Sequence, residues 1–131
     1  VNKMSRDKRR YVGKIGYCSN KDLPTLRHLP KGHYVYIRKV YPDGTCDVNT
    51  ITSLEDKFGN FNPQRLYYVR HGDTYPIPKG DINLPLWSGV KRDVITGVRI
   101  SDIRYVGSVG IKRRHKFFIG KFMNNYPKRR K

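Results

Sequence analysis

Apolar and polar residues alternate through the middle of the chain, in short runs separated by Gly, Pro, Asn and Asp. Such alternation is typical of β-strands, because successive side chains point to opposite faces of a sheet. The clearest pair of runs, 33–40 and 45–51, is rich in β-branched and aromatic residues. Between them, residues 41–44 (YPDG) supply a Pro with fixed φ and a Gly that tolerates positive φ. The pattern predicts a β-hairpin with one face against the core.

Shorter runs elsewhere predict further strands at 65–70, 93–100 and 104–106, the second with a bulge at Gly97. Residues 53–64 and the Pro-rich stretch 71–85 are expected to be loop or irregular. Residues 101–102 can begin a short helix or turn, and periodicity does not decide between helix and strand for 115–122. The predicted fold class is therefore mainly β, a β-rich α+β domain with short helices.

The charge is concentrated at the two ends of this 131-residue chain, whose length is that of one domain. Of a net charge of +18, residues 1–14 carry +5 and residues 112–131 carry +9, which leaves +4 for residues 15–111. We therefore predict a basic N-terminal arm (1–14), a single domain (15–111) and a basic C-terminal segment (112–131). Basic chain ends are typical of nucleic-acid binding, although a solubilising, partly disordered tail has the same composition.

If the ends bind nucleic acid, their cations neutralise phosphates and affinity falls with salt, so that deleting 112–131 should flatten the salt dependence. Phe117 and Phe118 directly follow the basic cluster and can stack on bases, but their apolar neighbours favour core packing. Tyr67, Tyr68 and Tyr75 can also stack on bases, whereas burial is favoured for Trp87. The expected phosphate-binding residues are Lys8, Arg9, Arg10, Lys112, Arg113, Arg114, His115, Lys116, Arg129 and Arg130.

Several classes of protein are not expected from this sequence. The apolar runs are far shorter than the roughly 20 residues of a membrane-spanning helix, and no apolar segment follows the charged first residues as in a secretory signal. Cys18 and Cys46 lack disulfide-scaffold or metal-ligand spacing, which favours buried thiols and a cytoplasmic location. The four His residues show no metal-ligand spacing, and residues 107–110 (GSVG) do not form a phosphate loop, so we expect no metal and no cofactor.

The order of segments between residues 30 and 110 resembles the MazF/PemK-like toxins, small β-barrel endoribonucleases of bacterial toxin–antitoxin systems. A strand–turn–strand unit ends in residues 51–53 (ITS), similar to the Thr-Ser-like motif beside the active site of that family. Residues 86–90 (LWSGV), followed by the strand from 93, resemble the family's Leu-x-x-Ser segment and next strand. Residues 101–107 (SDIRYVG) are similar to the stretch after it. The resemblance implies a small SH3-like barrel.

The resemblance also implies metal-independent RNA cleavage, in which a 2′-hydroxyl attacks the adjacent phosphate. Where the family has an Arg-Pro pair this chain has residues 32–34 (GHY), so the nearest catalytic candidates are His33 and Lys31. We expect His33 to act as acid or base, because its ordinary pKa lies near neutrality. Lys31 would neutralise charge, and Thr52 and Ser53 would hydrogen-bond the scissile phosphate, unless the latter two merely cap a turn.

Two alternatives to a ribonuclease remain open at this point. One is a non-catalytic DNA- or RNA-binding regulator or inhibitor of the kind encoded by phages and plasmids, and the other is a ribosomal-type structural RNA binder. The expected partner is nucleic acid in each case, with RNA favoured over DNA. The resemblance adds a possible antitoxin protein and a possible homodimer, and no membrane partner is expected.

Overall fold

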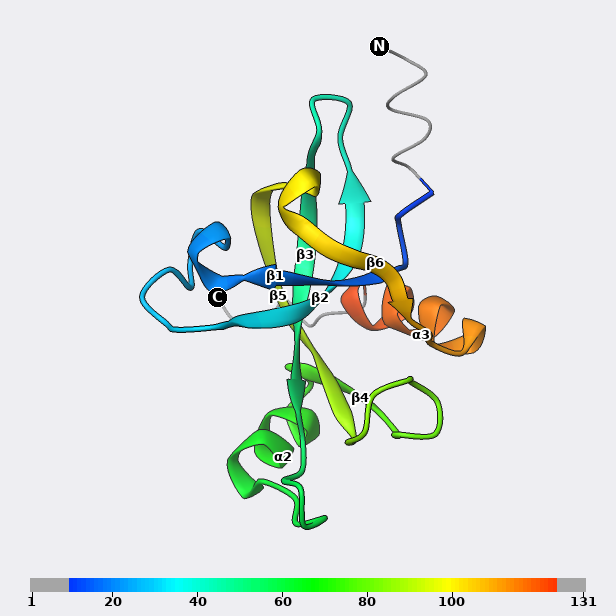
Figure 1. The fold of residues 1–131 in the computed structure, drawn as a ribbon. Coiled ribbons are helices and arrows are strands. Elements are labelled where there is room, and N and C mark those ends of the chain that lie inside the picture. The colour runs from blue at the N-terminus through cyan, green and yellow to red at the C-terminus, as the bar shows by residue number, and fades with distance from the viewer. Residues whose placement is uncertain (1–9, 125–131) are drawn as a thin grey trace, which may run out of the picture.

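The computed structural model describes residues 10–124, which form one mainly β domain with two α-helices (Figure 1). The strands are β1 (Ile15–Ser19), β2 (Gly32–Val40), β3 (Thr45–Ser53), β4 (Thr74–Ile77), β5 (Ser88–Arg99) and β6 (Ile103–Val109). The α-helices are α2 (Pro63–Arg70) and α3 (Arg113–Asn124), and two short 3-10 helices are η1 (Asn20–Asp22) and η2 (Ile100–Asp102). The mainly β fold class predicted from the alternation is confirmed.

The six strands form a single antiparallel sheet in the order β4-β5-β3-β2-β1-β6. Strands β4 and β6 are its two edges, so the sheet remains open and does not close into the barrel that the family resemblance implies. Strand β4 suits an edge because it contains Pro76, which has no N–H to donate to another strand. The long strand β3 runs through the whole molecule and connects its two ends (Figure 1).

The predicted hairpin is present as β2 and β3, with its turn at 41–44. Gly44 adopts a φ of +90°, and its N–H donates to the carbonyl of Tyr41 at 3.1 Å. The sequence predicted that one face of the hairpin is buried, whereas in the structure both faces are covered by apolar clusters. Val35 and Val48 belong to one apolar cluster, whereas Tyr36 belongs to a second cluster on the other face.

The bulge predicted at Gly97 is also present. The pairing of β3 with β5 shifts register between Cys46 and Val48, opposite residues 95–98, and Gly97 takes a φ of +75°. Strand β5 begins at Ser88, before the predicted start at 93. Glycine is suited to this position because the left-handed region carries no Cβ penalty for it.

The strand predicted at 65–70 is wrong, since these residues lie in helix α2. Asn62 caps the helix: its Oδ1 accepts a hydrogen bond from the Arg65 N–H at 3.1 Å. Pro63 occupies the first turn, where a missing N–H costs nothing. This Asn-Pro start is a local helix signal that outweighs the β propensity of the two tyrosines that follow.

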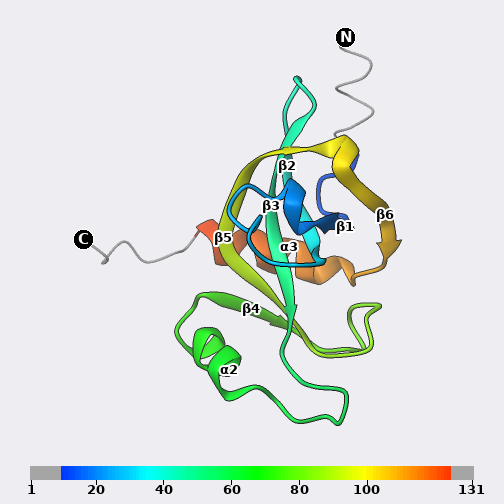
Figure 2. The same ribbon diagram turned by 60° about the vertical axis from the view of Figure 1, so that its left-hand side comes forward.

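Helix α3 packs on one face of the sheet (Figure 2), so the described part of the basic C-terminal segment belongs to the domain. Ile119 is 0% exposed and lies in the second apolar cluster, and Met123 packs against that cluster. Core packing of the two phenylalanines is contradicted, because Phe117 is 64% and Phe118 46% exposed. The helical period of 3.6 residues turns them away from the face that carries Ile119.

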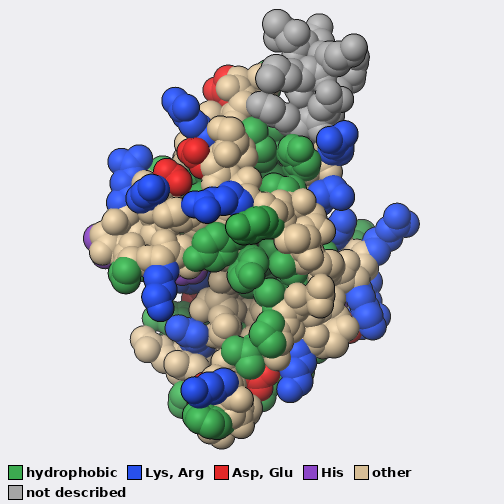
Figure 3. Space-filling model, in the orientation of Figure 1, with side chains coloured by type: hydrophobic (Ala, Val, Ile, Leu, Met, Phe, Trp, Pro, Cys, Tyr) green, Lys and Arg blue, Asp and Glu red, His purple; other side chains and the backbone are tan. Residues whose placement is uncertain are grey.

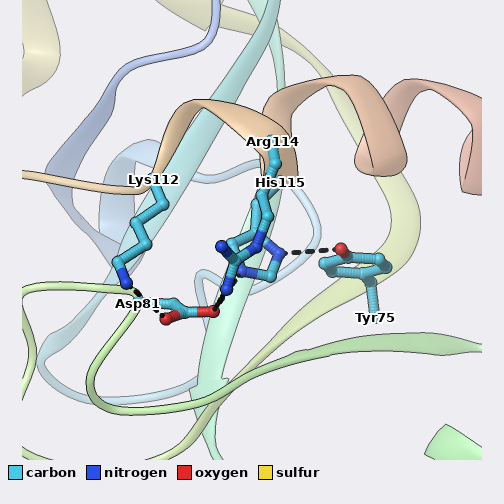
Figure 4. A network of polar contacts seen from close by, with 5 residues as sticks. All are labelled: Tyr75, Asp81, Lys112, Arg114 and His115. Atoms are coloured by element: carbon cyan, nitrogen blue, oxygen red, sulfur yellow. Dashed lines mark hydrogen bonds and ion pairs between the residues drawn. The ribbon is translucent and has the colours of Figure 1, made fainter.

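The start of α3 is held by Asp81, on which three side chains from 112–115 converge (Figure 4). Lys112 Nζ lies 3.2 Å from Asp81 Oδ1, and Arg114 Nη2 and His115 Nε2 each lie 2.7 Å from Oδ2. His115 Nδ1 lies 2.8 Å from the hydroxyl of Tyr75, which is in β4. The hydrogen bond from His115, followed by those of the other two donors, lowers the pKa of Asp81 to about 2.

Cys18 and Cys46 are both free thiols and fully buried, as their spacing predicted. Burial is the main reason that the pKa of Cys18 rises to about 11 and that of Cys46 to about 12, so both remain protonated at neutral pH. Within residues 10–124, no helix combines the length and the apolar character needed to cross a bilayer.

Candidate functional site

A hollow beside helix α2 collects side chains from five elements and encloses about 250 Å³. We name it the His33 cleft. It contains two of the four predicted catalytic residues, His33 at the start of β2 and Thr52 near the end of β3. The remaining lining residues come from α2, β4 and β5, and they are Gln64, Arg65, Tyr68, Thr74 and Lys91. The cleft therefore combines one imidazole with two cations and several neutral polar groups.

The imidazole of His33 is anchored by Asn20, a residue of η1 that is only 2% exposed. The Nδ2 of Asn20 donates to the carbonyl of Pro30 at 2.7 Å, so its Oδ1 must be the atom that faces His33. The distance between His33 Nδ1 and Asn20 Oδ1 is 2.6 Å. An amide oxygen only accepts, so this network assigns a proton to Nδ1. In the neutral ring, Nε2 is then the nitrogen that can accept a proton.

The electrostatic environment favours the neutral form of His33. Burial lowers its pKa from the ordinary value of 6.5, and the positive charges of Lys91 and Arg65 lower it further. A histidine with a depressed pKa is unprotonated at neutral pH and can serve as a general base. Perturbed titratable groups in hollows of this kind are typical of functional sites.

Arg65 is placed at the cleft by the first turn of α2 and by a contact with β3. Its Nη1 donates to the carbonyl of Ser53 at 2.6 Å. This bond uses one of the five N–H donors of the guanidinium group, and the others can bind an anion. Arg65 thus belongs to the helix that replaced the predicted strand.

Lys91 lies at an irregular part of β5, where the pairing with β3 shifts register between Asn49 and Ile51. Asn49 is fully buried, and its Nδ2 donates to the carbonyl of Lys91 at 3.0 Å. The same Nδ2 lies 3.3 Å from the carbonyls of Arg92 and Asp93, so one amide group holds three successive residues. The backbone that carries Lys91 is therefore fixed by a buried polar contact.

The other predicted catalytic residues are not part of this cleft. Ser53 lines a neighbouring hollow, and Thr52 lines both this hollow and the His33 cleft. Lys31 is exposed and is not among the residues that line the His33 cleft. Its backbone has a φ of +67°, and its carbonyl accepts from the Asn20 N–H at 2.8 Å. The positive charge beside His33, which Lys31 was expected to provide, comes from Arg65 and Lys91.

The predicted phosphate-binding residues fall into three groups. Lys112 and Arg114 pair with Asp81, and His115 is 7% exposed and contacts the same carboxylate, which takes its imidazole off the surface. Arg10 is exposed, as are Arg113 and Lys116 on the outer side of α3. The remaining four residues lie outside the described part of the chain, and they are Lys8, Arg9, Arg129 and Arg130.

The outer side of α3 forms a second basic surface, which we name the α3 face. It comprises Arg113, Lys116, Phe117, Phe118 and Lys121, all of them exposed. The ring of Phe117 contacts that of Phe118 at 5.6 Å between centroids, and Lys121 Nζ lies 5.5 Å from the Phe117 centroid. Figure 3, in the orientation of Figure 1, shows Lys and Arg side chains spread over the visible face of the molecule, with few acidic side chains among them.

Sequence reasoning identified His33, Thr52 and the stacking candidate Tyr68, but it did not identify Arg65, Lys91 or the anchor Asn20. The helix signal at residues 62–63 could have placed Arg65 one turn into a helix. No local pattern marks Lys91 or Asn20, whose positions depend on pairing between distant strands.

Among residues 10–124, no three His, Cys, Asp or Glu side chains gather as metal ligands would. No protein-family model matches the chain, and no curated protein is significantly similar to it in sequence. The function of this chain must therefore be inferred from its own residues.

Proposed function

We propose that the protein binds RNA and cleaves it in the His33 cleft by acid–base catalysis. The observation that supports this most directly is the composition of the cleft. A single hollow contains an imidazole with a depressed pKa, a guanidinium, an ammonium and the hydroxyl-bearing Thr52. These groups suit an anionic phosphodiester and proton transfer beside it.

The proposed step needs only groups of the cleft and solvent. The 2′-oxygen of the ribose forms a bond to phosphorus while the bond from phosphorus to the 5′-oxygen breaks. The proton of the 2′-hydroxyl passes to Nε2 of His33, and the leaving 5′-oxygen takes a proton from water. The products are a 2′,3′-cyclic phosphate and a free 5′-hydroxyl. Asn20 holds the reacting imidazole in the required tautomer through Nδ1.

The two cations act on the charge of the phosphate. Negative charge grows on the non-bridging oxygens as the five-coordinate transition state forms, and Arg65 and Lys91 stabilise it electrostatically. The same cations lower the pKa of His33, so the base is ready before RNA binds. Thr52 contributes a hydroxyl that can donate to a phosphate oxygen.

The proposal is tested by incubating the protein in EDTA with single-stranded RNA, duplex RNA, DNA and an RNA in which one nucleotide lacks its 2′-hydroxyl. We expect cleavage of single-stranded RNA, no cleavage of DNA, and protection of the bond that follows the 2′-deoxy nucleotide. The fragments should end in a cyclic phosphate, identified by mass spectrometry. Cleavage after the 2′-deoxy nucleotide, or fragments with a 5′-phosphate, would contradict the mechanism.

A second candidate function, binding of nucleic acid without cleavage, is supported by the α3 face. Exposed aromatic rings among cations can stack on unpaired bases while the cations contact phosphates. Phe117 and Phe118 are surrounded by Arg113, Lys116 and Lys121, with no acidic residue between 112 and 131. Binding without cleavage in the EDTA experiment would select this function.

Replacing the three cations of the α3 face by Gln should flatten the salt dependence of RNA binding. Each lost phosphate contact lowers the slope of log K against log salt by about 0.7 for a single strand, so we expect a change of about 1–2. Fluorescence anisotropy at several salt concentrations measures the slope. The matched control replaces Arg27, Arg99 and Arg104, which are exposed on other elements, by Gln. Equal slopes for the two triple variants would show that the α3 face is not a contact surface.

A further inference from the structure

Strand β5 contains a bulge, residues 91–93, next to the His33 cleft. These three residues lie between Val90 and Val94, whereas β3 has only Thr50 between the partners of the two valines. The bulge is therefore outside the regular pairing of β3 with β5. Bulges are over-represented beside active sites, where they redirect a side chain. This one begins with Lys91, one of the two cations that line the cleft.

We propose that Arg92, the middle residue of this bulge, is a positioning residue that holds Lys91 in the His33 cleft. The inference rests on the proposed function, because Lys91 has to meet the phosphate in that cleft. It gives a role to a cation that does not itself line the cleft and that no sequence pattern marks.

The guanidinium group of Arg92 binds backbone carbonyls at the ends of both α-helices. Its Nε donates to the carbonyl of Gly72, just past the end of α2, at 2.8 Å. Its Nη1 donates to the carbonyl of Phe122 at 2.6 Å and lies 3.4 Å from that of Met123, both in the last turn of α3. The last four carbonyls of a helix have no partner within the helix, so Arg92 caps α3. One side chain thus connects the bulge to both helices.

An aromatic ring lies against the same guanidinium group. The Cζ of Arg92 is 3.9 Å from the ring centroid of Phe122. That ring also contacts the ring of Tyr75 in β4, at 5.6 Å between centroids. Hydrogen bonds along the edge of the planar guanidinium and a ring against its face together fix its orientation. The side chain of Arg92 is therefore a rigid attachment for the bulge.

The backbone of the bulge has its own contacts, which set where it lies along the sheet. Asn49 Nδ2 lies 3.0–3.3 Å from the three carbonyls of residues 91–93. The Arg92 N–H donates to the carbonyl of Asp73 at 2.9 Å. Without the Arg92 side chain the bulge keeps these contacts but loses those to the two helices. Lys91 is then no longer held at one position in the cleft.

The variant Arg92→Gln tests this inference by a measurement that needs no RNA. NMR titration gives the pKa of His33, which burial and then the charge of Lys91 lower. If Arg92 holds Lys91 beside His33, the pKa of His33 should rise toward 6.5 in the variant. The matched control is Arg99→Gln, which removes the same charge from an exposed residue of β5 and should leave the pKa of His33 unchanged.

A double-mutant cycle with Lys91→Gln shows whether Arg92 acts through Lys91. In the Lys91→Gln background, Arg92→Gln should cause no further change in the pKa of His33. Arg92→Gln alone should slow cleavage of single-stranded RNA by about 10–100-fold, because a misplacement of about 1 Å can cost about 100-fold. In the Lys91→Gln background the same substitution should change the rate by less than about twofold.

Circular dichroism shows whether each variant is folded. If Arg92→Gln does not fold, Phe122→Leu removes the ring against the guanidinium and should raise the pKa of His33 by a smaller amount. An unchanged pKa of His33 in the folded variant would overturn the inference, as would an equal rise with and without Lys91. A wild-type protein that does not cleave RNA would contradict the proposed function alone, because the pKa of His33 still reports the position of Lys91.

Discussion

Replacing His33 with Ala should lower the rate of RNA cleavage by about 100-fold or more, because a positioned acid–base group contributes about 10²–10⁴-fold. The affinity for RNA should change by less than about threefold, since Arg65 and Lys91 remain in the cleft and the ring is neutral at pH 7. Single-turnover cleavage and fluorescence anisotropy on the same RNA measure the two quantities. A loss of rate without a loss of affinity is expected of a catalytic residue.

The matched control is His28→Ala, because His28 is exposed and does not line the cleft. This variant should cleave RNA at the wild-type rate. If His33→Ala cleaves as fast as the control, His33 is not the base and the proposed mechanism fails. If both variants lose activity together, the loss is not specific to the His33 cleft and the assignment of His33 as the base fails.

The environment of His33 determines how the rate of RNA cleavage changes with pH. Burial, and then the charges of Lys91 and Arg65, lower its pKa below 6.5, so the unprotonated base predominates at pH 7. The rate should rise with pH through this pKa, below 6.5, and should not rise further through pH 7 on account of His33. NMR titration of the imidazole should give the same lowered pKa. A rate whose midpoint lies above 6.5 would assign the base role to another group.

Replacing Ile119 with Ala should lower the free energy of unfolding by about 2–5 kcal/mol, as is usual for a fully buried aliphatic side chain. The cost combines the lost burial of the removed methyl and methylene groups with the cavity that they leave. Urea denaturation followed by circular dichroism measures the change. This is the largest stability effect that we expect from a single residue of the basic C-terminal segment.

Phe117→Ala is the control for Ile119→Ala, because the two residues lie on opposite sides of the same helix and Phe117 is 64% exposed. Its effect on stability should stay within about 1 kcal/mol. Comparable losses for the two variants would mean that α3 does not dock on the sheet through Ile119.

The docking of Ile119 also determines how the RNA contacts of the C-terminal segment can be tested. Deletion of 112–131 removes Ile119 from the core, so substitutions on the α3 face are the appropriate test of its contacts with RNA.

Local patterns predicted two features of the fold. The hairpin of β2 and β3 followed from the alternation and from the turn that ends at Gly44. The bulge at Gly97 followed from the tolerance of glycine for positive φ, although its partner strand β3 is distant in sequence. The prediction failed at α2 because tyrosines and a valine suggested a strand. The Asn62 cap and Pro63 instead satisfy a helix start, and an eight-residue helix at the end of the molecule buries little that could override them.

Some residues of the candidate site could be predicted from the sequence and others could not. His33 and Thr52 were predicted, and the β2–β3 pairing that brings them to one hollow is the predicted hairpin. Ser53 was assigned to the same site, but it lines a neighbouring hollow that shares only Thr52 with the His33 cleft. Lys91 could not be predicted, because its position depends on the pairing of β5 with β3 and on the buried Asn49.

The sequence by itself determined that this protein is mainly β, that its cysteines are buried, and that its charge is concentrated at the ends. These properties depend on side-chain period, composition and counting, which need no knowledge of distant contacts. Only the tertiary structure decided which cations lie together. It turned Lys112, Arg114 and His115 toward Asp81, and it brought Arg65 and Lys91 to His33. Coulombic and hydrogen-bonding energies depend on distances of a few ångströms, and strand pairing and helix docking set those distances.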